Sequence, residues 1–254
     1  MKITKEMLKA KSPCTDGYEW YLRKFPEGGE YQEILDALCE DDRFNDACWL
    51  LNAFGKTDDV LEIETLERKS FVFAGSIRVK GWIKIDFSLR AGSGIEAGEG
   101  IEAGSGIEAG EGIKAGSGIE AGEGIEAGEG IEAGEGIEAG SGIEAGEGIK
   151  AGSGIKAGSG IKAGEGIKAG SGIKAGWGIE AGWGIKAGEG IEAGWGIKAG
   201  WGIKAGEDYG IFAALRLRLS NWSFYGRVTA KNKPANLMTG HWVDLVESEN
   251  KDAA

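Results

Sequence analysis

Hydrophobic and polar residues alternate with a fixed six-residue period along the middle of this chain. From Ala91 to Lys204 the unit Ala-Gly-x-Gly-Ile-Glu/Lys occurs nineteen times in succession, and x is Ser, Glu or Trp. In an extended chain, Ile95 and Ala97 point to one face and Glu96 points to the other. A fixed short period of this kind indicates a solenoid. The pattern therefore predicts short strands whose Ile and Ala side chains form the core.

Glycine pairs separate these strands and predict corners. In the segment Gly98-Glu99-Gly100, we expect the two glycines to adopt positive φ without the penalty of a Cβ atom, while Glu99 projects outward. The spacing between glycines alternates between two and four residues. A collagen triple helix needs glycine at every third position, so the spacing excludes it.

The repeat unit resembles that of the bacterial-transferase hexapeptide family, whose units often read Ile-Gly-x-Gly-Val-x. The resemblance covers the repeat alone. It implies a left-handed parallel β-helix in which three units form one triangular coil of 18 residues. Ala occupies the position that this family usually fills with a large aliphatic residue. We therefore expect a mainly β protein, a single-chain parallel β-solenoid with a small N-terminal helical domain and a C-terminal cap.

The flanking segments depart from the repeat in different ways. Asp16 and Glu19 form a possible capping box, which predicts a helix that begins there. Upstream of the repeat, counting back six residues from Ile95 gives Leu89, and further steps of six reach larger apolar residues. The six-residue register therefore continues upstream and indicates an irregular first coil. Apolar residues alternate over 211–219, which predicts a strand that caps the open end. The predicted divisions are 1–58, a small helical domain; 59–90, the irregular first coil and N-cap; 91–207, the hexapeptide-repeat solenoid; and 208–254, the capping strand and tail.

The N-terminal segment also resembles the helical leaders of repeat proteins from phages and prophages. The residues that carry this resemblance run from Cys14 to Phe25, with Cys48-Trp49-Leu50-Leu51 after them. It covers about 50 residues and implies a genomic setting rather than a mechanism.

Charge and cysteine content indicate the compartment and the class of partner. The formal net charge of −12 disfavours direct binding to nucleic acid or to an anionic membrane. The three cysteines, Cys14, Cys39 and Cys48, have no framework spacing and are expected to be reduced, buried thiols. No apolar stretch is long enough to span a bilayer. We expect a soluble protein in the cytoplasm of a bacterial host cell.

Charge is also polarised along the repeat. Residues 91–149 contain fourteen Glu and one Lys, a net of −13, whereas residues 150–204 contain eight Lys and four Glu, a net of +4. If positions 18 apart stack, the four repeat tryptophans fall on two corners and form two stacked pairs. We expect these pairs to flank one face, whose charged residues are drawn from Glu180, Lys186, Lys198 and Lys204. The predicted partner-binding residues are Glu111, Glu129, Glu135, Glu147, Trp177, Trp183, Trp195 and Trp201.

Catalysis is disfavoured by the residue types. The repeat contains no His, and the chain has one, His241, whereas hexapeptide acyltransferases use a His as base and the related carbonic anhydrases bind metal through three. Stacked Glu on a solvated face are too hydrated to serve as acid and base. An ice-binding face usually relies on Thr ladders, and the repeat has no Thr. We expect no enzyme activity, no catalytic or cofactor-binding residues, no cofactor and no metal.

The remaining functions are those of an interaction protein. An acidic β-solenoid can imitate the charge of a nucleic-acid duplex, as some pentapeptide-repeat proteins do. With the phage-like leader, the sequence favours a non-enzymatic inhibitor that presents an acidic, nucleic-acid-like surface to a host nucleic-acid-handling or defence protein. The alternative is a structural scaffold, a spacer or a self-assembling repeat protein. The expected partner is a protein, with a homo-oligomer as a further possibility.

Overall fold

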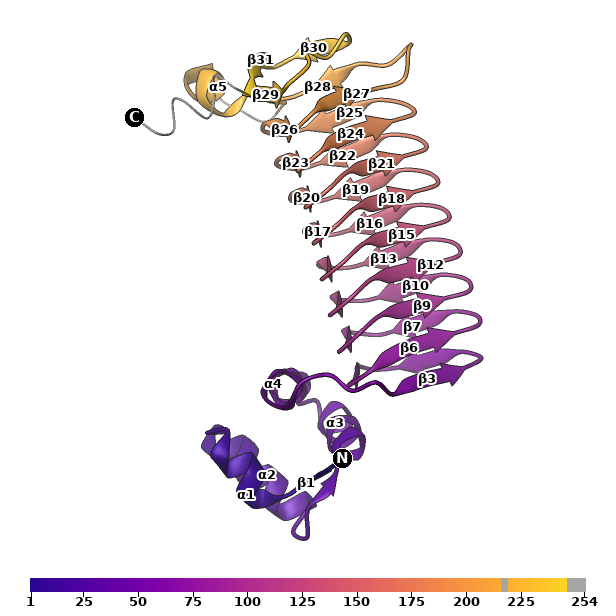
Figure 1. Cartoon of the computed structure of the whole chain (residues 1–254), viewed down its shortest axis with the longest axis vertical. Coiled ribbons are helices and arrows are strands. Elements are labelled where there is room, and N and C mark those ends of the chain that lie inside the picture. The colour runs from indigo at the N-terminus through magenta and orange to yellow at the C-terminus, as the bar shows by residue number, and fades with distance from the viewer. Residues whose placement is uncertain (216–218, 246–254) are drawn as a thin grey trace.

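The protein is a parallel β-solenoid of about ten turns with a small helical domain at its N-terminal end (Figure 1). The computed structural model describes residues 1–215 and 219–245. The helices are α1 (Lys5–Ala10), α2 (Thr15–Lys24), α3 (Tyr31–Glu40), α4 (Phe44–Phe54) and α5 (Leu219–Tyr225). A short antiparallel pair joins β1 (Lys2–Ile3) and β2 (Gly29–Glu30). None of the helices in the described ranges is long and apolar enough to cross a membrane.

Three parallel sheets form the three faces of the rod. The first face contains β3 (Val60–Ile63), β6 (Ser76–Val79), β9 (Ile95–Ala97), β12 (Ile113–Ala115), β15 (Ile131–Ala133), β18 (Ile149–Ala151), β21 (Ile167–Ala169), β24 (Gly184–Ala187) and β27 (Gly202–Lys204). The second face contains β4 (Leu66–Arg68), β7 (Ile83–Ile85), β10 (Ile101–Ala103), β13 (Ile119–Ala121), β16 (Ile137–Ala139), β19 (Ile155–Ala157), β22 (Ile173–Ala175), β25 (Ile191–Ala193), β28 (Ile211–Phe212) and β30 (Leu237–Thr239). The third face contains β5 (Phe71–Phe73), β8 (Leu89–Ala91), β11 (Ile107–Ala109), β14 (Ile125–Ala127), β17 (Ile143–Ala145), β20 (Ile161–Ala163), β23 (Ile179–Ala181), β26 (Ile197–Ala199), β29 (Arg227–Ala230) and β31 (His241–Asp244).

The repeat period sets the coil. Ile101 pairs with Ile119 and Ala103 with Ala121, so each coil contains 18 residues and the inward positions stack in register. The repeat Ile and Ala side chains are almost fully buried. The predicted register also holds upstream, where Ile77, Ile83 and Leu89 are buried in the same core. Both predictions, the 18-residue parallel coil and its first irregular turn, are confirmed.

The repeat glycines have a different role from the one predicted. Among the described residues, positive φ in glycine occurs at Gly28, Gly55 and Gly240, and not at the corners of the repeat. At the first glycine of each pair, a Cβ atom would overlap with a backbone carbonyl oxygen one coil below; Gly134, for example, lies directly against the carbonyl of Gly116. Close stacking of the corners, and not left-handed backbone, therefore excludes a side chain here.

The N-terminal helices form a second small core beside the rod. Trp20, Tyr21, Ile34, Leu35 and Leu50 are among its buried side chains. The prediction of a capping box at Asp16 is wrong, because α2 already begins at Thr15. Its N-cap is Cys14, whose Sγ accepts a hydrogen bond from the Gly17 amide at 3.3 Å. All three cysteines are free, but only Cys39 is buried; Cys48 is partly buried and Cys14 is exposed, so the expectation that all three are buried holds for Cys39 alone.

The helical domain is fastened to β5, the first strand of the third face. Val72 and Ala74 point away from the solenoid core and pack into the helical core. Gln32 of α3 donates from Nε2 to the Val72 carbonyl oxygen at 2.8 Å, and its Oε1 accepts from the Ala74 amide at 3.0 Å. One side chain thus satisfies two backbone groups of an edge strand, which would otherwise be open to pairing with another chain.

The C-terminal cap differs from the predicted strand over 211–219. The strand β28 ends at Phe212, Ala214 adopts φ 65°, and α5 begins at Leu219. Residues 216–218, within the predicted strand, and residues 246–254 of the predicted tail lie outside the described residues. The cap is made by later segments instead. The strands β28 and β30 extend the second face, and β29 and β31 extend the third.

Candidate interaction surface

The corner residues form three straight edges along the rod. Along the regular coils, the corner amide donates a hydrogen bond to the carbonyl oxygen of the corner residue one coil below, as Glu147 does to Glu129 at 3.2 Å; at the upper end Gly206 takes the place of Glu207 as the donor to Glu189. The first edge, between the third and first faces, is Ser93, Glu111, Glu129, Glu147, Glu165, Trp183 and Trp201. The second, between the first and second faces, is Glu99, Ser117, Glu135, Ser153, Ser171, Glu189 and Glu207. The third, between the second and third faces, is Ser105, Glu123, Ser141, Ser159, Trp177 and Trp195.

The first edge brings together five of the eight predicted partner-binding residues. Glu111, Glu129 and Glu147 precede Trp183 and Trp201 on the same edge. Glu135 lies on the second edge, and Trp177 and Trp195 lie on the third. Glu165 is not among the predicted residues, although the structure places its backbone between those of Glu147 and Trp183. The first edge is therefore acidic over its lower part and aromatic at its upper end.

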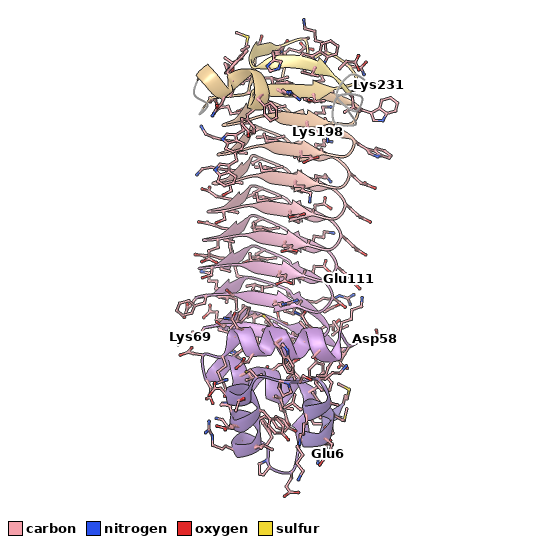
Figure 2. The ribbon with its side chains drawn as sticks, turned by 90° about the vertical axis from the view of Figure 1, so that its left-hand side faces the viewer. Glu6, Asp58, Lys69, Glu111, Lys198 and Lys231 are labelled. Carbon is pink, nitrogen blue, oxygen red and sulfur yellow. The ribbon has the colours of Figure 1, made fainter. Side chains whose placement is uncertain are left out.

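Glu111 differs from the other carboxylates of this edge, because it is paired. Its Oε1 lies 2.6 Å from Nζ of Lys56, in the segment that joins α4 to the solenoid. The hydrogen bond and the charge of Glu111 raise the pKa of Lys56 above its ordinary value. Figure 2 shows Glu111 on the right-hand edge of the rod, just above the level of α4. Glu111 thus helps to hold the helical domain on the rod and is less available to a partner.

Arg90 of β8 joins the lower part of the third face to the helical domain. Arg90 donates to Oδ1 of Asn52 in α4 at 2.7 Å and lies 2.8 Å from Glu108. Burial raises the pKa of Glu108 above its ordinary value, while the Arg90 charge opposes that shift. Both side chains are therefore committed to the contact between the helical domain and the rod.

Ion pairs mark the border between the acidic and basic halves of the rod. At this level each face carries a Glu stacked beneath a Lys of the next coil: Glu132 with Lys150, Glu138 with Lys156, and Glu144 with Lys162. The hydrogen bond and charge of Lys150 lower the pKa of Glu132. These are exposed pairs, which contribute little stability individually. Each of them neutralises one carboxylate at the level where the sign of the charge changes.

The tryptophan prediction is confirmed in part. Trp177 and Trp195 stack with ring centroids 5.6 Å apart and an interplanar angle of 9°. The Lys231 ammonium lies over the ring of Trp201, 4.7 Å from its centroid. Figure 2 shows Lys231 on the same edge as Glu111, near the upper end of the rod. Lys231 could not be found from the repeat period, because its segment returns to the rod after an irregular excursion.

The first and third edges, which carry the tryptophans, both border the third face as predicted, but the tryptophan side chains line two different grooves. Trp183 and Trp201 line a groove of about 1290 Å³ along the first face, together with Lys186 and Lys204. Trp177 and Trp195 line a separate groove along the third face, together with Glu180 and Lys198. The reason is that each corner side chain lies over the strand that follows it. Trp195 is also partly covered, since its ring lies 5.2 Å from that of Tyr225 in α5.

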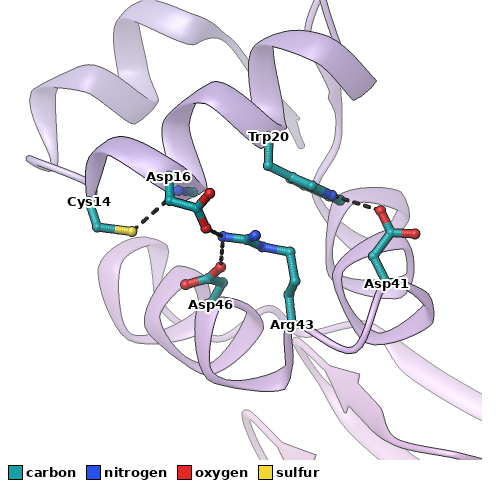
Figure 3. Close-up of polar contacts among 7 residues, drawn as sticks. Cys14, Asp16, Trp20, Asp41, Arg43 and Asp46 are labelled. Carbon is teal, nitrogen blue, oxygen red and sulfur yellow. Dashed lines mark hydrogen bonds and ion pairs between the residues drawn. The ribbon is translucent and has the colours of Figure 1, made fainter.

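Polar residues of the helical domain are arranged for its own stability. Arg43 lies between Asp16 of α2 and Asp46 of α4, at 2.6 and 2.5 Å (Figure 3). The indole Nε1 of Trp20 donates to Asp41 at 2.7 Å. These contacts fasten α2 to α4 and to the turn before it. Across the described part of the chain, no three or more His, Cys, Asp and Glu side chains are grouped so that they could hold a metal ion.

Comparison with known proteins relates the helical domain alone to a family. Residues 1–56 match the model of the YdhT N-terminal domain. No curated protein matches the chain. No solved structure matches it either. The match ends before the solenoid begins, so the surface described above lies outside the family model.

Proposed function

We propose that this chain is a non-enzymatic binding protein whose acidic half imitates a nucleic-acid duplex and occupies the basic groove of a nucleic-acid-handling or defence protein. The observation that carries the proposal is the density of unpaired carboxylates. Eight of the fourteen Glu in residues 91–149 form no ion pair within the described part of the chain. They are Glu99, Glu102, Glu120, Glu123, Glu126, Glu129, Glu135 and Glu147.

The linear density of these charges is close to that of duplex DNA. The eight carboxylates span residues 99–147, which is about 2.7 coils or ~13 Å of rod at the ~4.8 Å spacing of paired strands. Lys114 lies in the same span and offsets one of them, so one net negative charge occurs per ~1.9 Å, compared with one per ~1.7 Å of axis in duplex DNA. Like charges stacked this closely repel one another, so the arrangement costs stability that a basic partner would recover.

The exposed tryptophans at the upper end of the first edge favour a protein partner that makes apolar contacts as well as electrostatic ones. Trp183 and Trp201 are 65% and 61% exposed. Exposed tryptophans next to a charged surface are typical anchors of protein interfaces. The carboxylates would guide a basic groove onto the rod, and the tryptophans would add apolar contact beyond it.

The resemblance of the N-terminal leader to those of phage and prophage repeat proteins supports an origin in such elements. A protein of that origin would act on a host system that handles or degrades nucleic acid. This part of the proposal rests on the resemblance alone.

Reversing the charge of Glu129, Glu135 and Glu147 to Lys tests the proposal. These side chains are exposed and unpaired, so the fold should be retained, whereas Glu111 is left unchanged because it pairs with Lys56. We expect capture of nucleic-acid-binding proteins from bacterial lysate, identified by mass spectrometry, to fall at least about tenfold. Duplex DNA and high salt should both release the proteins captured by the unaltered chain.

The matched control replaces the same three residues by Asp, which keeps the charge and should keep the capture. Circular dichroism of both variants verifies the solenoid. The proposal fails if the Lys variant captures the same proteins as the unaltered chain, or if duplex DNA releases none of them.

A further inference from the structure

The second face carries a row of charges that becomes complementary to itself when its direction is reversed. Along its strands β7 to β28, which leave out only the outermost strands β4 and β30, the outward residues at the strand centres are Lys84, Glu102, Glu120, Glu138, Lys156, Lys174, Glu192 and Phe212. We propose that two copies of this chain pack antiparallel through this face, related by a two-fold axis at the level between Glu138 and Lys156.

This arrangement places opposite charges against each other. Glu138 of one copy faces Lys156 of the second copy, and Glu120 faces Lys174; the two-fold axis forms each contact twice. Glu138 and Lys156 already pair within one copy, so the dimer joins four charges into one network at its centre. Networks of this kind stabilise more than isolated exposed pairs. Parallel packing at equal height would instead place each Glu against its own counterpart, and it is disfavoured.

One pair of like charges meets in the antiparallel register, and a neighbouring lysine offsets their repulsion. Glu102 faces Glu192 of the second copy. Glu192 lies 2.8 Å from Lys174 of its own chain. The Lys174 ammonium therefore lies beside both carboxylates and reduces their repulsion.

Aromatic residues stand at both ends of the second face, where the register brings the ends of the two copies together. Trp82, 39% exposed, packs over Gly100 at the lower end, with the Lys84 ammonium 5.6 Å from its ring centroid. Tyr209, 47% exposed, and Phe212 line the same face at its upper end. Antiparallel packing opposes Trp82 with Tyr209 and Lys84 with Phe212. Each end of the interface thereby gains an apolar and cation–π contact.

The other two faces suit this packing less well. On the first face, an antiparallel overlap of all nine strands would oppose Arg78 with Lys186, Lys114 with Lys150 and Glu132 with its own counterpart. On the third face, α4 and α5 stand at the lower and upper ends, on the left side of the rod in Figure 1. Figure 2 looks directly onto this side, and α4 there crosses in front of the strands. A second rod could not lie flat against this face.

The size of the second face predicts a weak dimer. Its eight strands from β7 to β28 extend for about 34 Å, and with the corners it is about 15 Å wide. Two copies would bury roughly 1,000 Å² in total, which is the lower limit for a specific interface. We therefore expect association at micromolar concentrations. The first edge lies opposite the second face, so both acidic edges remain open on the outside of the dimer.

A charge-swap experiment with the full chain tests the inference. Sedimentation at about 0.1 M salt, where the net charge is screened beyond about 10 Å, should show a concentration-dependent dimer. The variants Glu120→Lys/Glu138→Lys and Lys156→Glu/Lys174→Glu should each raise the dissociation constant at least about tenfold, because like charges then meet. An equal mixture of the two variants should restore a dimer, since four Lys of one copy then face four Glu of the other.

The matched control, Lys168→Glu/Lys186→Glu, makes the same exchange on the first face and should leave the dimer unchanged. A monomer at all concentrations overturns the inference, as does a trimer. A dimer that survives both second-face variants assigns the contact to another surface. A mixture that stays monomeric rules out the antiparallel register. None of these results depends on capture of another protein, so this test and that of the proposed function fail independently.

Discussion

Replacing Gly134 by alanine is expected to destabilise the solenoid by about 3–5 kcal/mol. The new Cβ atom would overlap with the Gly116 carbonyl oxygen, which belongs to the rigid backbone of the coil below. The two coils would have to separate at that corner. This would weaken the hydrogen bonds from the Gly134 amide to Ala115, 3.1 Å, and from the Glu135 amide to Ser117, 3.0 Å. The midpoint of guanidinium unfolding, followed by circular dichroism, measures the loss.

The second glycine of the same corner provides the matched control. A Cβ atom on Gly136 would lie 3.5 Å from the Gly154 carbonyl oxygen, an ordinary van der Waals contact, and Gly136 has no positive φ. We expect Gly136→Ala to leave the midpoint unchanged or to raise stability by up to about 1 kcal/mol, because alanine restricts the unfolded chain. Equal losses in the two variants would show that glycine is needed for its backbone conformation and not for the close approach of the coils.

Replacing Gln32 by alanine is expected to cost about 2–4 kcal/mol, because it leaves two buried backbone groups of β5 without their partners. These are the Val72 carbonyl and the Ala74 amide, in residues that are 0% and 2% exposed. The bond from Gln32 Nε2 to Asp36, 2.8 Å, is lost as well. Guanidinium unfolding followed by tryptophan fluorescence measures the change in the helical domain. Light scattering should show increased association through the opened strand edge.

The loss of stability on replacing Gln32 should depend on pH. Burial raises the pKa of Asp36 above its ordinary value, and the hydrogen bond from Gln32 lowers it. Without Gln32 the pKa rises further, so the ionised form of Asp36 is less well accommodated in the folded state. The difference in unfolding free energy between variant and unaltered chain should therefore be largest at neutral pH. It should narrow as the pH falls through the titration range of Asp36.

Two further variants test whether the loss of stability comes from the broken hydrogen bonds or from a weaker helix. Gln32→Glu keeps the shape and the acceptor for Ala74 but loses the donor for Val72, so it should destabilise as Gln32→Ala does. Glu33→Ala, on the exposed side of the same helix, should stay within about 0.5 kcal/mol of the unaltered chain. A loss that is equally large for Glu33→Ala would contradict the bridging role of Gln32.

The sequence predicted only part of the candidate interaction surface, because the contacts and directions of the corner side chains depend on local packing. The 18-residue register placed Glu129, Glu147 and Trp183 on one edge from the sequence alone. It could not show that Glu111 is bound to Lys56, since that contact joins residues 55 positions apart in unrelated elements. It placed the two tryptophan pairs on either side of one face, but it could not show that Trp183 lines the groove of the first face while Trp177 lines that of the third.

The repeat by itself determined the architecture of this protein. A strict six-residue period with Ile and Ala at inward positions admits one way to bury every unit, which is to stack identical coils, so the core and the register followed from the pattern. The tertiary structure alone decided what lies at the two ends and why the corners need glycine. Those features arise from contacts between segments with no common period, such as Gln32 with β5 and Lys231 with Trp201, or from the separation between coils. A one-dimensional pattern specifies which residues repeat, but only the folded backbone sets how closely the coils approach and which surface the irregular segments cover.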